Sequence, residues 1–136
     1  MEKLELYLGE EQYGASFTMS DLEPLLSGIV FPNLRSLGLR DSEWADEVAA
    51  AVAQAPVLSR LTTLDLSLGN LSDAGAKCLL ESPGVARLKK LDLHHHYISR
   101  PLMARLAEAG PLVQLDDMNE PDEYKGKAVR YIAIGE

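Results

Sequence analysis

One arrangement of leucines recurs along the chain at a fixed distance, and it constrains the fold more than any other feature. The pattern is "LRSLGL" at 34–39, "LTTLDL" at 61–66 and "LKKLDL" at 88–93, so each copy begins 27 residues after the previous one. A partial copy, "LEL", lies at 4–6, and a degraded copy, "LVQLDD", lies at 112–117. Self-similarity at a period of about 20 to 50 residues is typical of repeat architectures. We therefore expect five strand units.

A helix-forming stretch follows each strand unit. The stretches are "EWADEVAAAVAQAP", "NLSDAGAKCLLESPG" and "YISRPLMARLAEAGP", preceded by the looser "MSDLEPLLSG". Serine–aspartate pairs at 20–21 and 72–73 offer side-chain oxygens that can cap the start of a helix. The predicted helix ends are marked by Pro56, by Pro83 and by Pro111. Each unit is thus predicted to be strand, loop, helix and turn.

Over residues 3–116 this pattern resembles the leucine-rich repeat, and its length and helical second half are similar to the ribonuclease-inhibitor-like subclass. The alanine- and leucine-rich copies are similar to bacterial repeat proteins of uncharacterised role. The Asn or Cys usual at the ninth position is replaced by Ser42, Gly69 and His96. The resemblance implies an α/β solenoid, a right-handed βα superhelix with a parallel sheet on the concave face and helices on the convex face. Such a stack bends because strands lie about 4.8 Å apart and helices need about 8 to 10 Å.

We interpret residues 1–136 as a single leucine-rich-repeat domain of about four to five repeats, with 117–136 as a C-terminal cap. The run "AVRYIAIGE" predicts a final strand, whose residues Tyr131, Ile132 and Ile134 would cover the last repeat. At the other end, Leu4 and Leu6 are predicted to lie on an uncapped edge strand. We therefore expect the chain to be the C-terminal part of a longer protein, or to associate with another chain through this edge.

Alternation along each strand places the first, fourth and sixth positions of a copy in the core and the third, fifth and seventh on the outer surface. The predicted fifth-position column is Glu5, Gly38, Asp65, Asp92 and Asp116. The third-position column is Lys3, Ser36, Thr63, Lys90 and Gln114. The seventh-position column is Tyr7, Arg40, Ser67, His94 and Met118. The acidic column indicates a site for a basic partner or a metal, or only a solvated surface.

Three consecutive histidines, 94–96, invite a metal-site interpretation, but consecutive residues on an extended chain rarely converge on one ion. His94 is predicted to face outward near Asp92, and a lateral aspartate would complete the one plausible set of ligands. His96 occupies the turn position, where its two ring nitrogens can bond the loop backbone. His95 is predicted to lie in the loop without a role. We expect no metal and no cofactor.

Two other residues are assigned to the core. Trp44 occupies the apolar position after the strand, and Cys78 lies within a predicted helix with no neighbouring histidine or basic cluster to activate its thiol. Nothing resembling a phosphate-binding loop or a nucleophile elbow is present in the sequence. We expect the protein not to be an enzyme.

The charge of −8 and the absence of a signal sequence or long apolar run argue against nucleic-acid and membrane partners and favour a cytoplasmic location. We predict a non-enzymatic module that binds a protein, preferably one with a basic surface, through the concave sheet. The predicted binding residues are Tyr7, Arg40, Asp65, Lys90, Asp92, His94 and Asp116. The alternatives are a structural capping segment of a larger repeat protein, or a metal-binding protein using Asp92 and His94.

Overall fold

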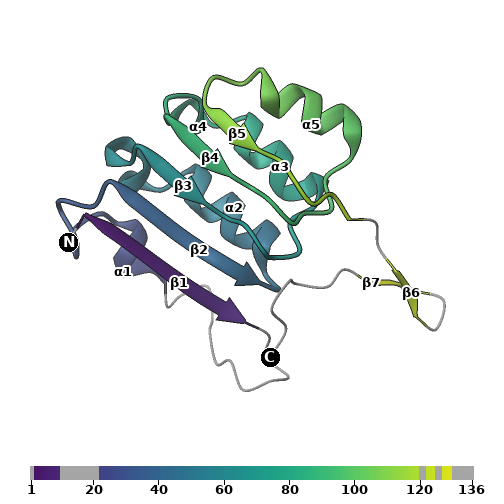
Figure 1. Cartoon of the computed structure of the whole chain (residues 1–136). Coiled ribbons are helices and arrows are strands. Elements are labelled where there is room, and N and C mark those ends of the chain that lie inside the picture. Colours follow the sequence, from purple (N-terminus) through teal and green to yellow (C-terminus); the bar gives the residue numbers. More distant parts are fainter. Residues whose placement is uncertain (1, 10–21, 120–121, 125–126, 130–136) are drawn as a thin grey trace.

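The protein has an α/β fold built on five parallel strands that lie side by side in chain order (Figure 1). The computed structural model describes all residues except 1, 10–21, 120–121, 125–126 and 130–136. The strands are β1 (Lys3–Gly9), β2 (Ser36–Ser42), β3 (Thr63–Asp65), β4 (Lys90–Asp92) and β5 (Leu112–Gln114). The five strand units predicted from the leucine pattern are therefore confirmed.

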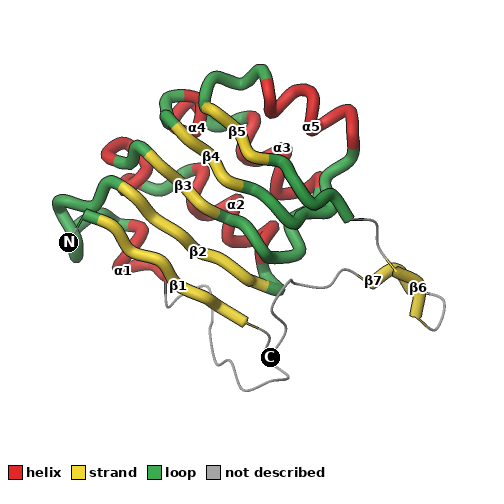
Figure 2. The backbone as a smooth tube through the Cα atoms, viewed as in Figure 1, coloured by secondary structure: helices red, strands yellow, loops and turns green. Residues whose placement is uncertain are grey.

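Helices follow the first four strands and lie on one side of the sheet (Figure 2). They are α1 (Glu23–Leu26), α2 (Ala45–Ala53), α3 (Asp73–Leu80) and α5 (Arg100–Ala107). Two further turns, the 3₁₀ helix η3 (Pro56–Arg60) and the short helix α4 (Pro83–Ala86), precede β3 and β4. Two of the three prolines predicted as helix ends, Pro56 and Pro83, therefore also begin a second helical turn, whereas Pro111 directly precedes β5. Proline suits this place because the first turn of a helix has no partner for its N–H groups.

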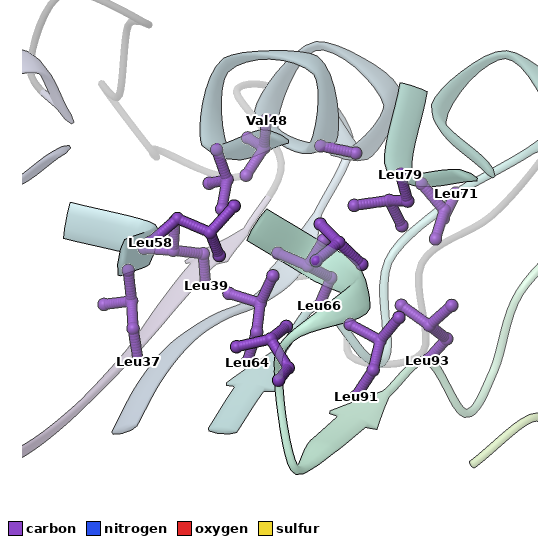
Figure 3. Close-up of a cluster of buried hydrophobic side chains, with 14 of the residues drawn as sticks. Leu37, Leu39, Val48, Leu58, Leu64, Leu66, Leu71, Leu79, Leu91 and Leu93 are labelled. Atoms are coloured by element: carbon purple, nitrogen blue, oxygen red, sulfur yellow. The ribbon is translucent and has the colours of Figure 1, made fainter. Parts of the chain in front are cut away.

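Leucines at equivalent positions form continuous rows between the sheet and the helices (Figure 3). Leu37, Leu64 and Leu91 pair with one another in register and are fully buried. A second buried row consists of Leu39, Leu66 and Leu93. Full burial of a leucine side chain contributes about 1.5 to 3 kcal/mol. This burial requires neighbouring strands to hold the same register, which fixes the alignment of the copies.

The last strand unit has a different register from the predicted one. β5 pairs with β4 so that Leu112 lies beside Lys90 and Gln114 beside Asp92. Leu112, expected in the core, is 68% exposed, while Val113 and Leu115 pack against the core. The shift arises because no turn like η3 or α4 separates α5 from β5, which shortens this connection. Asp116 therefore leaves the fifth-position column, and Gln114 takes its place.

The same left-handed turn ends the strand region of four copies. In each of these copies one residue of the turn has positive φ: Asp41, Leu68, His95 and Asp117 in chain order. The amides of the first three donate to the next strand's carbonyls, at 2.9 Å each, on Ser67, His94 and Asp116. A non-glycine residue in this conformation costs about 1 to 2 kcal/mol, which the lateral hydrogen bond helps to offset. The turn at Asp117 places Asp116 in the seventh-position column.

Helix starts are capped from the neighbouring copy, which corrects the predicted local caps at 72–73. Asp46, in the first turn of α2, accepts hydrogen bonds from Ser72 N (2.8 Å), Ser72 Oγ (2.6 Å) and Gly75 N (3.1 Å) at the start of α3. Asp73 in turn accepts from Ser99 N at 2.7 Å, before α5. The pair at 20–21 lies outside the described residues. Each of these carboxylates therefore joins one helix to the next.

Other predictions concern the core and the two ends of the sheet. Trp44, expected to be buried, is 39% exposed, because α2 begins directly after it and Ala45 takes the buried place. Cys78, also expected in the core, is half-buried. Leu4 and Leu6 on the edge strand β1 are partly buried.

None of the described helices is long and apolar enough to span a membrane.

The predicted C-terminal cap falls mostly on residues outside the described part. Its described strands, β6 (Asp122–Tyr124) and β7 (Lys127–Val129), form a separate antiparallel pair. No described strand pairs with the outer edge of β1 or β5. Tyr131, Ile132 and Ile134 are among the residues not described, so the covering strand stays a prediction.

The substitution Asp46→Ala should destabilise the protein by about 2 kcal/mol, because it removes three hydrogen bonds that a carboxylate accepts. Urea unfolding at neutral pH measures this change. Glu47→Ala is the matched control, since Glu47 lies in the same helical turn and is exposed. An equal loss in both variants would contradict the lateral cap.

Gly75→Ala should also destabilise, by about 1 to 3 kcal/mol, although alanine ordinarily favours a helix. A Cβ at this position would lie 2.4 Å from Leu71 Cδ1 and 3.1 Å from Asp46 Cα, because α3 approaches α2 closely here. Thermal unfolding of the variant tests the expectation. Ala74, an exposed neighbour in the same helix, provides the control as Ala74→Gly, which should cost about 1 kcal/mol without any clash.

Candidate functional site: the open face of the sheet

The open face is the surface of the five-stranded sheet turned away from the helices, and it carries three rows of side chains. The third-position row is Lys3, Ser36, Thr63, Lys90 and Leu112. The fifth-position row is Glu5, Gly38, Asp65, Asp92 and Gln114. The seventh-position row is Tyr7, Arg40, Ser67, His94 and Asp116. Within each row, neighbouring side chains come from successive copies, so each side chain can contact the next one along the row.

Arg40 joins three strands of the open face. Its guanidinium donates from Nε to Ser67 Oγ at 3.0 Å and from Nη1 to the Tyr7 hydroxyl at 2.9 Å. The same group lies 3.3 Å from Asp65 Oδ2 and 3.9 Å from Glu5 Oε2, and its carbon is 5.1 Å from the centre of the Tyr7 ring. Only 17% of the Arg40 side chain is exposed. Arg40 therefore offsets the repulsion that the acidic row would otherwise produce.

Two aspartates of the fifth-position row, at the ends of β3 and β4, each bond the residue two places ahead in the chain. Asp65 Oδ1 accepts from the Ser67 amide at 2.9 Å, and Asp92 Oδ1 accepts from the His94 amide at 3.1 Å. The His94 ring also bonds Asp92, with Nδ1 2.7 Å from Oδ1. These contacts hold both carboxylates in fixed positions, although Asp65 and Asp92 are register neighbours with like charge.

A depression of about 240 Å³ lies on the open face over β1 to β4. Gly38 forms part of it, because a Cβ there would approach Glu5 Cγ to 3.1 Å and would project into the acidic row. The charged side chains that line the depression are Lys3, Glu5, Arg40, Asp65, Lys90 and Asp92. Its lining therefore holds three acidic and three basic side chains, so the acidic column expected from the sequence supplies only half of the charged residues there.

The predicted binding residues fall into three groups in the structure. Tyr7 contacts Arg40, and Arg40 contacts Asp65. Lys90 and Asp92 line the depression, with His94 bonded to Asp92. Asp116 is exposed and lies next to His94 in the seventh-position row, not beside Asp92. The sequence missed Ser36, Gly38 and Thr63 as lining residues, although their small size at outward positions was a usable signal.

The three histidines have different environments. His94 lies on the open face, and His95, in the left-handed turn, places Nδ1 3.0 Å from the Gly69 carbonyl oxygen. His96 is fully buried. Within the described residues, no group of three or more His, Cys, Asp or Glu side chains is arranged to hold a metal ion.

His96 performs the structural role predicted for it. Its Nδ1 accepts from the Ile98 amide at 3.1 Å, and its Nε2 lies 2.9 Å from the Leu115 carbonyl oxygen. Because Nδ1 must be unprotonated to accept, this geometry selects the neutral ring with the proton on Nε2. Burial lowers the pKa of His96 below its ordinary value of 6.5, outweighing the opposing effect of the Leu115 carbonyl. His95 lowers the pKa of His96 by a smaller amount, and Asp117 raises it.

The turns of two other copies use different residues at and beside the ninth position. Ser42 Oγ accepts from the Trp44 amide at 2.9 Å, as His96 does from Ile98. At Gly69 a Cβ would lie 2.7 Å from the Ser42 carbonyl oxygen, so no side chain fits. Asn70, the next residue, instead bonds the turn of the preceding copy, donating to the Glu43 carbonyl at 2.7 Å and accepting from Ala45 N at 3.3 Å. Ser42 and His96 thus each bond their own turn, whereas the copy with Gly69 uses the following residue to bond a neighbouring turn.

The stability that depends on neutral His96 should be fully present above about pH 6.5 and decline as the pH falls through the lower folded-state pKa. The unfolded chain binds the proton more readily, so acid favours unfolding. Urea unfolding of the wild type and of His96→Asn, from about pH 7.5 to about pH 5.5, measures this effect. The stability difference between the two proteins should shrink on acidification. His94→Asn is the control, and a difference that does not vary with pH would contradict the assignment.

The comparisons with known proteins give one informative similarity. No family model matches the chain, and no curated protein matches it. A Bacteroides fragilis protein whose crystal structure was determined by the Northeast Structural Genomics Consortium is similar, with a TM-score of 0.82 and 34% sequence identity. The similarity covers 88% of this chain and 35% of that protein. The chain thus spans about a third of the length of a protein that shares its α/β fold.

Proposed function

We propose that the protein is a leucine-rich-repeat solenoid that binds a protein partner through the open face of its sheet, without catalysis. The solenoid assignment is supported by the in-register pairing of equivalent leucines and by left-handed turns at equivalent positions. Lateral caps between successive helices support it further. In such an architecture each repeat contacts mainly its neighbours, which leaves one broad sheet surface for binding.

The observation that carries the binding function is the Tyr7–Arg40 pair at the margin of the depression. Tyr7 is 56% exposed, yet its hydroxyl and ring are held by the nearly buried Arg40 guanidinium. Tyrosine and arginine are enriched among residues that dominate binding energy at interfaces. A tyrosine fixed before binding loses little conformational entropy on association, so it suits an interface anchor.

The chemistry of the open face supports binding more than metal chemistry. The Asp92 and His94 side chains bond one another, and the three histidines lie in different environments. The depression is lined by hydroxyl and charged side chains suited to hydrogen bonding with a partner surface. The function proposed is thus rigid presentation of aligned polar side chains.

A photo-crosslinking amino acid placed at Lys3, which lines the depression and leaves the Tyr7–Arg40 pair intact, tests this function in lysate of the source organism. The same amino acid at Arg87, on the helical side, is the control. A specific partner should crosslink from position 3 and not from position 87. The identified partner is then titrated with Tyr7→Ala/Arg40→Ala and with Glu81→Ala/Arg87→Ala, both exposed on the helical side. The first variant should bind about 30-fold more weakly, the second unchanged. Loss of binding only in the second variant would overturn the proposal.

A further inference from the structure

Three neighbouring side chains on the open face offer hydrogen-bond donors that the described part of the chain does not use. Ser36, Thr63 and Lys90 lie side by side in the third-position row, on β2, β3 and β4. All three line the depression and are partly exposed. Neither hydroxyl, nor the ammonium group, has a side-chain partner among the described residues. We name Ser36, Thr63 and Lys90 the donor row.

The carboxylates beside the donor row are, in contrast, already engaged. Glu5 lies 3.4 Å from Lys3 Nζ and 3.9 Å from Arg40 Nη1. Asp65 contacts Arg40 and accepts from the Ser67 amide, and Asp92 accepts from the amide and ring of His94. Among the described residues, the cation of the depression that has no ion pair is therefore Lys90.

Space for an incoming group is provided by small residues within the donor row and beside it. Gly38 is buried and has no side chain, and Ser36 and Thr63 are the shortest polar residues of the lining. Because acidic and basic residues are equal in number there, the depression does not itself repel an anion through net charge. The chain's overall charge of −8 acts from a distance, where salt screens charges separated by more than about 8 to 10 Å.

We propose that the donor row binds an acidic side chain, aspartate or glutamate, on an extended segment of the protein partner. The carboxylate accepts from the Lys90 ammonium and from the Thr63 and Ser36 hydroxyls, while the segment lies across the strands over Gly38. Hydrogen bonds from a charged donor to a carboxylate are stronger than neutral ones, so Lys90 is the main determinant. This inference rests on the proposed function and specifies the partner's chemistry, in place of the basic partner that the sequence favoured.

Nuclear magnetic resonance of the ¹⁵N-labelled full chain tests the inference with two capped peptides, acetyl-AEAEA-amide and acetyl-AKAKA-amide. The glutamate peptide should shift the amide signals of Ser36, Thr63 and Lys90 saturably, and the lysine peptide should not. Lys90→Gln should weaken glutamate-peptide binding about tenfold. Lys89→Gln, at an exposed neighbouring position, should leave it unchanged. Preserved amide spectra in both variants confirm that each one folds.

Three outcomes would overturn the inference: saturable binding of the lysine peptide at these amides, no saturable binding of the glutamate peptide, or equal binding by wild type and Lys90→Gln. Each is distinguishable from failure of the proposed function. Crosslinking from position 3 reports whether any partner uses the open face, whatever its charge. A partner captured there without glutamate-peptide binding would retain the interaction function and remove only the acidic specificity.

Discussion

The fold depends on lateral pairing between equivalent positions of successive copies. β3 and β4 are three residues long, too short to be stable as isolated strands, and their leucines are buried only between neighbouring copies. The same pairing extends beyond the sheet. The Asp41 amide, near the end of β2, donates to the Ser67 carbonyl beyond the end of β3, and Asp46 accepts from Ser72 at the start of α3. Each copy therefore depends on its neighbour both for these hydrogen bonds and for the burial of its leucines.

Lateral register creates an electrostatic difficulty on the open face. If each copy carried the same acid at the fifth position, carboxylates would lie beside one another on every strand, with mutual repulsion. The chain avoids this by varying its copies. Gly38 removes one acid from the row, Arg40 contacts the carboxylates on both sides of it, and His94 bonds Asp92. The depression over Gly38 is a consequence of that variation, since a fully repeated sequence would fill it.

Much of the fold could be predicted from the sequence, because burial of leucine imposes a strict spacing. The 27-residue period located β2, β3 and β4 and assigned their buried leucines correctly. The fifth copy was misaligned because "LVQL" matches the pattern at Leu112 and Leu115, whereas the length of the preceding connection decides the register. Trp44 was misplaced for a related reason, since the starting residue of α2 depends on backbone bonds that a pattern of apolar residues does not encode.

The candidate site was less predictable than the scaffold, because its charge distribution depends on which pairs of side chains contact one another. The sequence identified Tyr7, Arg40, Asp65 and Lys90 as outward residues. It did not show that Arg40 engages carboxylates while Lys90 has no ion pair with a described residue. These differences depend on side-chain reach across strands about 4.8 Å apart. The turn residues behave in the opposite way, because different side chains there give the same result. Ser42, Asn70 and His96 are chemically unlike, yet all satisfy backbone groups of the same kind of turn. Scaffold positions therefore tolerate varied residues when a backbone bond is preserved, whereas open-face positions change the surface offered to a partner with every substitution.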